Sequence, residues 1–321
     1  MAYRLRDSEP LPDGIRRIVL EQIDRALERL KPKTRNKDRA IHEGRVCFKK
    51  VRSVLRLVSC EIGADLFRLE NAEYRDMGRK LSVVRDTAVV AETLETLLQH
   101  SSRNFAGADL KSLRKRLGLS RVEQHVDRNE VLVQVADVLH SARNRVESWP
   151  LEGNNFSVLG MGLRRVYKQG LESFESVRMS PSSEGFHQWR KQVKYLLYEI
   201  NVLNPLWPKM LDVLARELSR LSDYLSEDHD LALLRERALE QSKALGDVTE
   251  IEGLVRLIDN RRARLEARAT ALGGRLYSEK PNAFRERFQS YWDVWHSTKT
   301  IDQVEAPPTN TASYQASASI F

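Results

Sequence analysis

The segment from Ile41 to Val58 constrains the fold most, because the charges on its polar face share one sign and follow a helical period. Wound as a helix at about 100° per residue, it places its basic side chains in an arc of roughly 80°, opposite an apolar face. We call these side chains the first stripe: His42, Arg45, Lys49, Arg52 and Arg56. An ordinary solvated helix face mixes Lys with Glu, because opposite charges one turn apart attract and like charges repel. The pattern therefore predicts either a basic surface without a partner or a face that binds an anion.

A second segment, from Phe186 to Leu203, repeats this pattern. When its first His is aligned with His42, at an offset of 145 residues, the Arg three positions on and the Lys seven positions on coincide. We call its polar face, with Lys191 at the margin, the second stripe: His187, Arg190, Lys191, Lys194 and Tyr198. A charged face that occurs twice at matching spacing favours the anion-binding interpretation.

The remaining sequence predicts further helices and no strands. Helical periodicity is expected over Ile15–Leu30, Ala64–Ser82, Asp86–His100, Asp109–Leu117, Arg121–Glu147, Met210–Leu225, Leu231–Leu245, Thr249–Leu272 and Ala283–Thr298. Met1 to Gly14 is expected to be extended, because it contains two prolines and ends in glycine. We therefore predict an all-α fold in which each half holds four or five helices in the same order, as a tandem duplication would produce.

The predicted domain covers residues 1–300, with repeat halves of about 1–150 and 151–300. Residues 301–321 are expected to be a disordered tail, because Glu305 to Phe321 is rich in Ala, Ser, Thr and Pro and has almost no charge.

The overall charge favours a polyanionic partner. Lys and Arg total 53 against 45 Asp and Glu, giving a net charge of +8 and a pI near 9.5. Nucleic acid, an anionic membrane and polyphosphate all fit this charge. Two scattered cysteines, no signal peptide and no apolar run of membrane-spanning length lead us to expect a cytoplasmic protein without a membrane partner.

Several motifs recur in the same order in the two halves, at offsets of 148 residues for the first pair, 145 for the second and 144 for the third. They are G-I-R-R at Gly14 (echoed by G-L-R-R at Gly162), H-x-x-R-x-x-x-K-K-x-R from His42, H-x-W-R-K-x-x-K-x-L-x-Y from His187, L-S-x-x-R-D at Leu81 and L-S-E-D-H-D-L at Leu225. Together they resemble the CHAD family, named for its histidine-containing α-helical domain, up to about residue 298.

The resemblance implies two helical bundles related by pseudo-twofold symmetry, with a basic groove or pore between them. It also implies inorganic polyphosphate as the ligand and a role at polyphosphate granules. Some relatives carry a hydrolase domain marked by E-x-E-x-K. Glu250 to Leu254 lacks the Lys of that signature, so we expect no attached hydrolase.

Polyphosphate requires cationic donors at successive helical turns, which are about 5.4 Å apart. The first-rank candidates are both stripes together with Lys50. The second-rank candidates are Arg16, Arg17, Arg164, Arg165, Tyr167, Lys168, Arg79, Lys80 and Arg85. The run Arg114-Lys115-Arg116 is read as a solvated turn rather than as a binding patch.

Other interpretations remain open at this point. The acidic cluster Glu227–Asp230 suggests a metal site, but its counterpart Val83–Asp86 lacks the ligands, so we favour a helix cap or a partner for an Arg. We expect no cofactor and no catalysis, because no Gly-rich phosphate loop, nucleophile elbow or HExxH motif is present. Nucleic acid is a less favoured ligand, because the stripes lack interleaved aromatic residues. A third alternative is an interaction scaffold that uses the charged helix Thr249–Leu272.

Overall fold

The computed structural model describes residues 3–31, 34, 36–83, 86–100, 114, 117, 118, 128–245 and 249–305. Within these residues the chain forms ten α-helices, one short 3-10 helix and no strand, which confirms the predicted all-α class. The elements are α1 (Leu11–Arg29), α2 (Lys37–Leu57), α3 (Ala64–Val83), α4 (Asp86–His100), α6 (Arg128–Val146), α7 (Ser157–Met179), α8 (Ser183–Leu203), η1 (Asn204–Leu206), α9 (Pro208–Leu245), α10 (Thr249–Leu276) and α11 (Pro281–Glu305).

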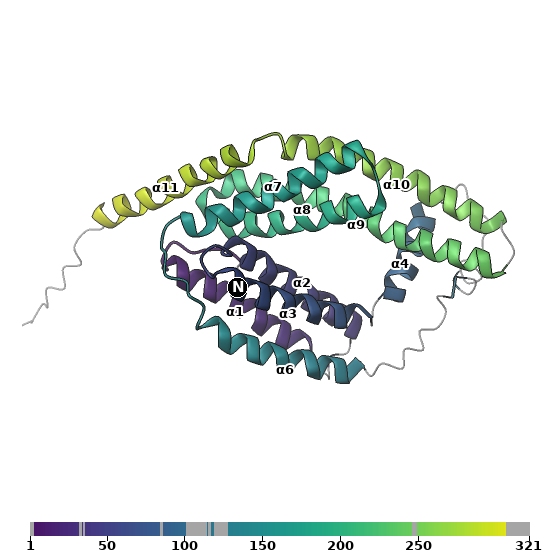
Figure 1. Cartoon of the computed structure of the whole chain (residues 1–321), viewed down its shortest axis with the longest axis horizontal. Coiled ribbons are helices and arrows are strands. Elements are labelled where there is room, and N and C mark those ends of the chain that lie inside the picture. The colour runs from purple at the N-terminus through teal and green to yellow at the C-terminus, as the bar shows by residue number, and fades with distance from the viewer. Residues whose placement is uncertain are drawn as a thin grey trace, which may run out of the picture.

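Two groups of helices lie against each other. Helices α1, α2, α3 and α6 pack together on one side, and α7, α8 and α9 pack on the other, with α10 and α11 along the outer edge (Figure 1). Helix α2 joins the groups, because it packs on α7 and α8 as well as on α1 and α3.

The two helices that carry the stripes are α2 and α8, and both begin at a side-chain cap. Asn36 accepts a hydrogen bond from the backbone N–H of Arg39, and Ser182 accepts one from that of Gly185. Such caps pair backbone donors that the first helical turn leaves without a partner. Where the helices meet, the buried hydroxyl of Ser53 donates to the carbonyl oxygen of Tyr195 at 2.9 Å. This bond sets the register of α2 against α8.

The main hydrophobic core crosses the predicted boundary at residue 150. It includes Phe48 and Trp149 from the first half and Phe156 and Trp189 from the second. A smaller core joins α4 to the α9–α10 pair through residues such as Leu94. Helix α4 therefore packs with the second half of the chain, beside α9 and α10 (Figure 1). The division into repeat halves stays a prediction.

Two expectations about helix boundaries are wrong. Residues 1–14 are not extended throughout, because α1 begins at Leu11. Pro12 is tolerated in the first turn of this helix, because the backbone N–H groups of a first turn have no acceptor within the helix, and the N–H that proline lacks is therefore not needed.

The predicted helices 210–225 and 231–245 form one helix, α9, that runs through the acidic cluster. Two carboxylates of the cluster form salt bridges with the neighbouring helix α10: Glu227 pairs with Arg261 and Asp228 with Arg262. The cluster therefore partners arginines instead of capping a helix.

Some expectations fall outside the described residues. These are most of the short helix 109–117, the start of the helix predicted from residue 121, and the tail from residue 306.

Helix α7 approaches the end of α2 at a glycine. A Cβ atom added to Gly162 would overlap the carbonyl oxygens of Arg56 and Leu57, and these backbone atoms belong to the helix that carries the first stripe. By contrast, a Cβ atom at Gly78 in α3 meets no atom within 4 Å.

We predict that Gly162→Ala destabilises the protein, because overpacking against backbone costs about 1–3 kcal/mol or more. The matched control Gly78→Ala should stabilise it by about 0.5–1 kcal/mol, because alanine favours a helix over glycine. Urea unfolding measures both changes. Equal stability of the two variants would show that α7 does not approach α2 so closely.

Candidate functional site

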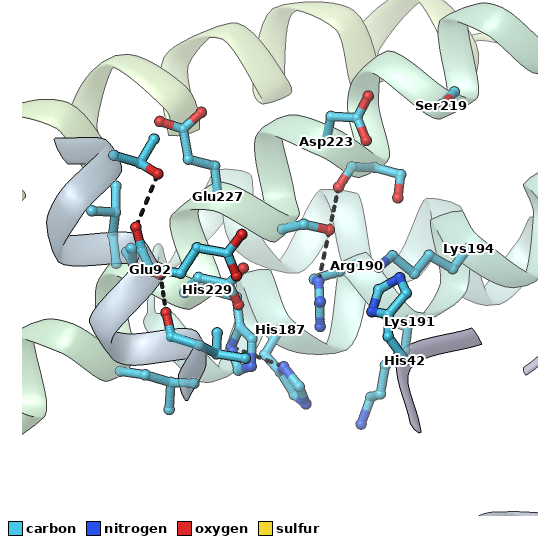
Figure 2. A pocket seen from close by; sticks show the side chains of 18 of the residues that line it. His42, Glu92, His187, Arg190, Lys191, Lys194, Ser219, Asp223, Glu227 and His229 are labelled. Carbon is cyan, nitrogen blue, oxygen red and sulfur yellow. Dashed lines mark hydrogen bonds between the residues drawn. The ribbon is translucent and has the colours of Figure 1, made fainter. Parts of the chain in front are cut away.

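A pocket with a volume of about 1560 Å³ opens between α2 and α8 on one side and α4, α9 and α10 on the other. Figure 2 shows side chains from these helices pointing into it. Members of both stripes line this one pocket although they lie 145 residues apart in the sequence. From the first stripe these are His42, Arg45, Lys49 and Arg52, and from the second His187, Arg190, Lys191, Lys194 and Tyr198.

The helical period explains why the stripes reach the pocket. On α2, Phe48 and Val51 face the core and are almost fully buried. On α8, Trp189 and Val193 do the same. Since residues three and four apart share a helix face, burial of these apolar faces turns the basic faces toward the pocket.

Positive charge exceeds negative charge on the described lining. Eight Lys and Arg side chains line the pocket against four carboxylates, a surplus of four positive charges before any histidine is protonated. The carboxylates are Glu92, Asp223, Glu227 and Asp230. In Figure 2, Asp223 lies on the same side of the pocket as Arg190 and Lys194.

The pocket partly removes the three cations of α8 from water, and their pKa values fall as a result. Burial, together with the charge of Arg190, lowers the pKa of Lys194 to about 8, although Asp230 and Asp223 oppose the change. Burial likewise lowers the pKa values of Arg190 and Lys191. Each shift has the sign expected when a low-dielectric site disfavours the charged form. An incoming anion would stabilise that charged form.

Tyr195 and Asn71 hold two arginines of the first stripe. The Arg56 guanidinium lies 3.9 Å from the centre of the Tyr195 ring, and Arg52 lies 5.8 Å from it. Both donate to the side-chain oxygen of Asn71, Arg52 at 3.0 Å and Arg56 at 2.9 Å. Arg52 reaches the pocket lining, whereas Arg56 does not. Arg56 therefore supports the wall behind Arg52.

A row of hydroxyls on α9 continues the donor surface. Arg190 donates through Nε to the hydroxyl of Ser226 at 3.0 Å, and that hydroxyl donates to the carbonyl oxygen of Ser222 at 2.6 Å. These bonds direct the Arg190 guanidinium across the pocket (Figure 2). Ser219 lines the same wall.

The remaining predicted site residues that the structure describes lie outside the lining, and most have structural partners. Three form ion pairs: Arg17 with Glu9 and Glu21, Arg79 with Asp76, and Lys168 with Glu172. Four donate hydrogen bonds: Arg16 to the carbonyl oxygens of Trp149 and Leu151, Arg164 to Asn282, Arg165 to Ser59, and Tyr167 to backbone carbonyls. Lys50 lies 4.8 Å from the centre of the Tyr3 ring. Lys80 is exposed on α3, and Arg114 pairs with Glu95. Arg85, Lys115 and Arg116 lie outside the described residues.

Sequence reasoning missed several lining residues. Arg261 and Arg264 of α10 line the pocket, whereas the sequence suggests a role for their helix only in the third alternative, the interaction scaffold. His229 of α9 also lines it, beside His187. One signal was present: at the offset of 144, His229 takes the place of Arg85, so both copies have a residue that can be cationic there.

Among the described residues, no three His, Cys, Asp and Glu side chains are grouped so that they could hold a metal ion. In the same part of the chain, no helix is both long enough and apolar enough to cross a membrane.

We predict that Lys194 loses its proton near pH 8 in the free protein, because burial and Arg190 disfavour its charge. Proton–carbon NMR of the protein with ¹³C-methylated lysines measures the midpoint, and Lys194→Gln identifies the resonance by its loss. Arg190→Gln should move this midpoint to higher pH, whereas Arg178→Gln, on the exposed side of α7, should not. A Lys194 midpoint near its ordinary value of about 10.4 would contradict the burial of this charge.

Comparison with known proteins connects this geometry to a family. No curated protein matches the chain. The family model described as the CHAD domain matches residues 17–239, which is more than half of the chain and includes α2, α3, α4, α6, α7 and α8. The protein therefore belongs to the CHAD domain family.

Proposed function

We propose that this protein binds inorganic polyphosphate in the pocket without hydrolysing it. The observation that carries the proposal is the meeting of both cationic stripes in one cavity. Membership of the CHAD family is consistent with polyphosphate as the ligand. We further infer that the cavity is the groove between two pseudo-twofold-related bundles, and that the protein acts at polyphosphate granules in the cytoplasm.

The chemistry of the lining suits a linear polyanion. Polyphosphate carries about one charge per phosphate and has no bases, so recognition depends on repeated cationic and hydrogen-bonding donors. Arg45 and Lys49 on α2, and Arg190 and Lys194 on α8, supply donors one helical turn apart. Arginine provides bidentate contacts to phosphate and lysine a mobile point charge. The cavity therefore offers consecutive phosphates a donor from either wall.

Electrostatics gives the ligand its driving force. Arg190 and Lys194 are both desolvated, and the charge of Arg190 disfavours that of Lys194. A bound polyanion replaces lost solvation and removes this repulsion, whereas an uncharged ligand could do neither. The anion should also stabilise the folded protein, because it requires both stripes in their folded arrangement.

Single-stranded nucleic acid fits the same charges less well. Proteins that bind it without sequence preference stack bases on aromatic side chains. In the described lining, the Phe, Tyr and Trp rings are those of Tyr195 and Tyr198. Arg56 covers Tyr195 at 3.9 Å, and Tyr198 packs edge-on against Tyr3. Both rings are thus engaged within the protein, which favours a ligand without bases.

The scaffold interpretation, in which α10 contacts a protein partner, is weakened because several charged side chains of this helix make their contacts within the chain. Arg261 and Arg262 pair with Glu227 and Asp228 of α9, so they join two helices of the same chain. Arg264 lines the pocket. These three arginines therefore contribute to the cavity and its wall.

We predict that both stripes serve one site. Arg45→Glu/Arg52→Glu and Arg190→Glu/Lys194→Glu should each weaken binding of a short, defined polyphosphate by about 100-fold or more, because each reverses two charges beside the ligand. Titration calorimetry measures affinity and stoichiometry, and circular dichroism checks the fold of each variant.

The charge-matched control is Lys168→Glu/Arg178→Glu, which reverses two cations on α7 outside the lining. It should bind as the wild type does. Unchanged affinity at half the stoichiometry in both pocket variants would mean two independent sites. If single-stranded DNA displaces long-chain polyphosphate at physiological salt and equal charge concentration, nucleic acid becomes the better candidate.

We predict no catalytic turnover. Incubation with long-chain polyphosphate, with and without Mg²⁺, should leave the chain length on a gel the same as in a sample without protein, because the lining is dominated by donors that bind oxyanions. Asp223 is a carboxylate of the lining whose pKa is raised by desolvation, so it is the residue to replace if shortening is seen. Shortening that Asp223→Asn abolishes would identify the protein as a hydrolase.

A further inference from the structure

Two histidines from different helices form a close pair in the pocket wall. His187 lies near the start of α8, and His229 lies in the middle of α9. Their Nδ1 atoms are 3.2 Å apart and their ring centroids 4.4 Å apart (Figure 2). At this distance the Nδ1–H of one ring donates to the Nδ1 lone pair of the other.

This hydrogen bond limits how many protons the pair can hold. When both rings are neutral, the donor ring has its proton on Nδ1, so its Nε2 is a lone pair. One added proton binds at that Nε2, and the Nδ1–H···Nδ1 bond remains. A second proton would have to bind at the accepting Nδ1, which would break the bond and place two cations side by side. The pair can therefore take up one proton and keep its hydrogen bond, whereas a second proton would break that bond.

The added proton changes what the pair offers to a ligand. In the neutral pair, one Nε2 is an acceptor and repels a phosphate oxygen. In the singly protonated pair, both Nε2 atoms carry a proton and both can donate. An oxyanion beside the pair therefore favours the protonated form.

Most groups around the pair oppose that proton while the pocket is empty. The cations that face the pair are Lys49 on α2 and Arg190, Lys191 and Lys194 on α8. Burial, and then these cations, lower the pKa of His187, and they lower that of His229 to about 3. His42 and Arg45 on α2 and Arg261 and Arg264 on α10 add further titratable or positive groups to the lining.

The negative groups are fewer. Glu184 on α8 favours protonation of His187. Glu92 on α4 and Glu227 and Asp230 on α9 also line the pocket. Glu227 is paired with Arg261 at 2.6 Å, and Asp230 lies close enough to Arg190 to favour its charge. These carboxylates therefore mainly balance the arginines.

We propose that His187 and His229 act as one proton-binding unit that clamps the ligand, so that each polyphosphate bound at the pair brings one proton into the pocket. This inference rests on the proposed function. The incoming proton comes from solvent and binds to the free Nε2, where the phosphate oxygen accepts the new N–H. Affinity therefore rises by up to about tenfold per pH unit as pH falls, between the pKa of the pair with ligand and its pKa without.

Titration calorimetry at pH 7.5 in buffers with different ionisation enthalpies counts the protons taken up. The terminal phosphates of the ligand titrate as well, so the decisive quantity is the difference between wild type and His187→Asn/His229→Asn. Asparagine retains a short polar side chain but does not titrate. The matched control is His140→Asn, which replaces an exposed histidine of α6.

A difference close to one proton, with none between wild type and His140→Asn, supports the one-proton unit. No difference, or a difference near two, overturns it while leaving polyphosphate binding established. Absence of any polyphosphate binding by the wild type at pH 6–8 rejects the proposed function itself.

A measurement on the wild-type protein covers the case in which the double variant does not fold. Nitrogen-15 spectra of labelled histidines at pH 7.5 should show both rings neutral in the free protein and one imidazolium in the pair when polyphosphate is bound. Two neutral rings in the bound protein would overturn the inference.

Discussion

The contact between α2 and α8 is the constraint on which the rest of the site depends. The buried bond from Ser53 to the carbonyl of Tyr195 fixes their register, and Phe48 and Trp189 anchor their apolar faces in the core. With those faces committed to the core, the basic faces have to line the pocket. Packing energy thus holds together charges that would otherwise repel.

The two faces of α2 and α8 therefore have different roles: one stabilises the fold and the other recognises the ligand. The core positions of the two helices stabilise the fold, whereas the polar positions oppose it, because Arg190 and Lys194 lose solvation without gaining full partners. Partly buried hydrogen bonds that Arg52 and Arg56 donate to Asn71 keep the guanidinium groups in place. A site of this kind is preorganised: its cations already point at the position of the ligand, so binding requires little reordering of long side chains.

Local periodicity was sufficient to predict the all-α class, the helices α2 and α8, and most of the cationic side chains that these two helices turn toward the pocket, although Lys50 and Arg56 lie outside its lining. It failed where tertiary contacts decide. The acidic cluster was expected to interrupt α9, but Arg261 and Arg262 on a neighbouring helix satisfy its charges, and no sequence period shows which helix lies alongside. In the same way, the sequence pattern around Arg16 is that of an exposed cation in the first turn of a helix. In the structure, however, Arg16 donates to two backbone carbonyls more than 130 residues away. The pairing of His187 with His229 also depends on which helices are neighbours.

The packing of α4 has a consequence for synthesis of the chain. Leu94 and Leu97 of this helix share a core with buried residues of α9 and α10, of which the first, Leu231, is more than 130 residues later in the sequence. At ribosomal rates of about 5–20 residues per second, these leucines wait roughly 7–27 s before their partners have been made. During that interval the nascent chain contains α4 without the α9 and α10 residues that cover its apolar face. The wall of the pocket that α4 forms can therefore be completed only late in translation, after the first-half helices are already in place.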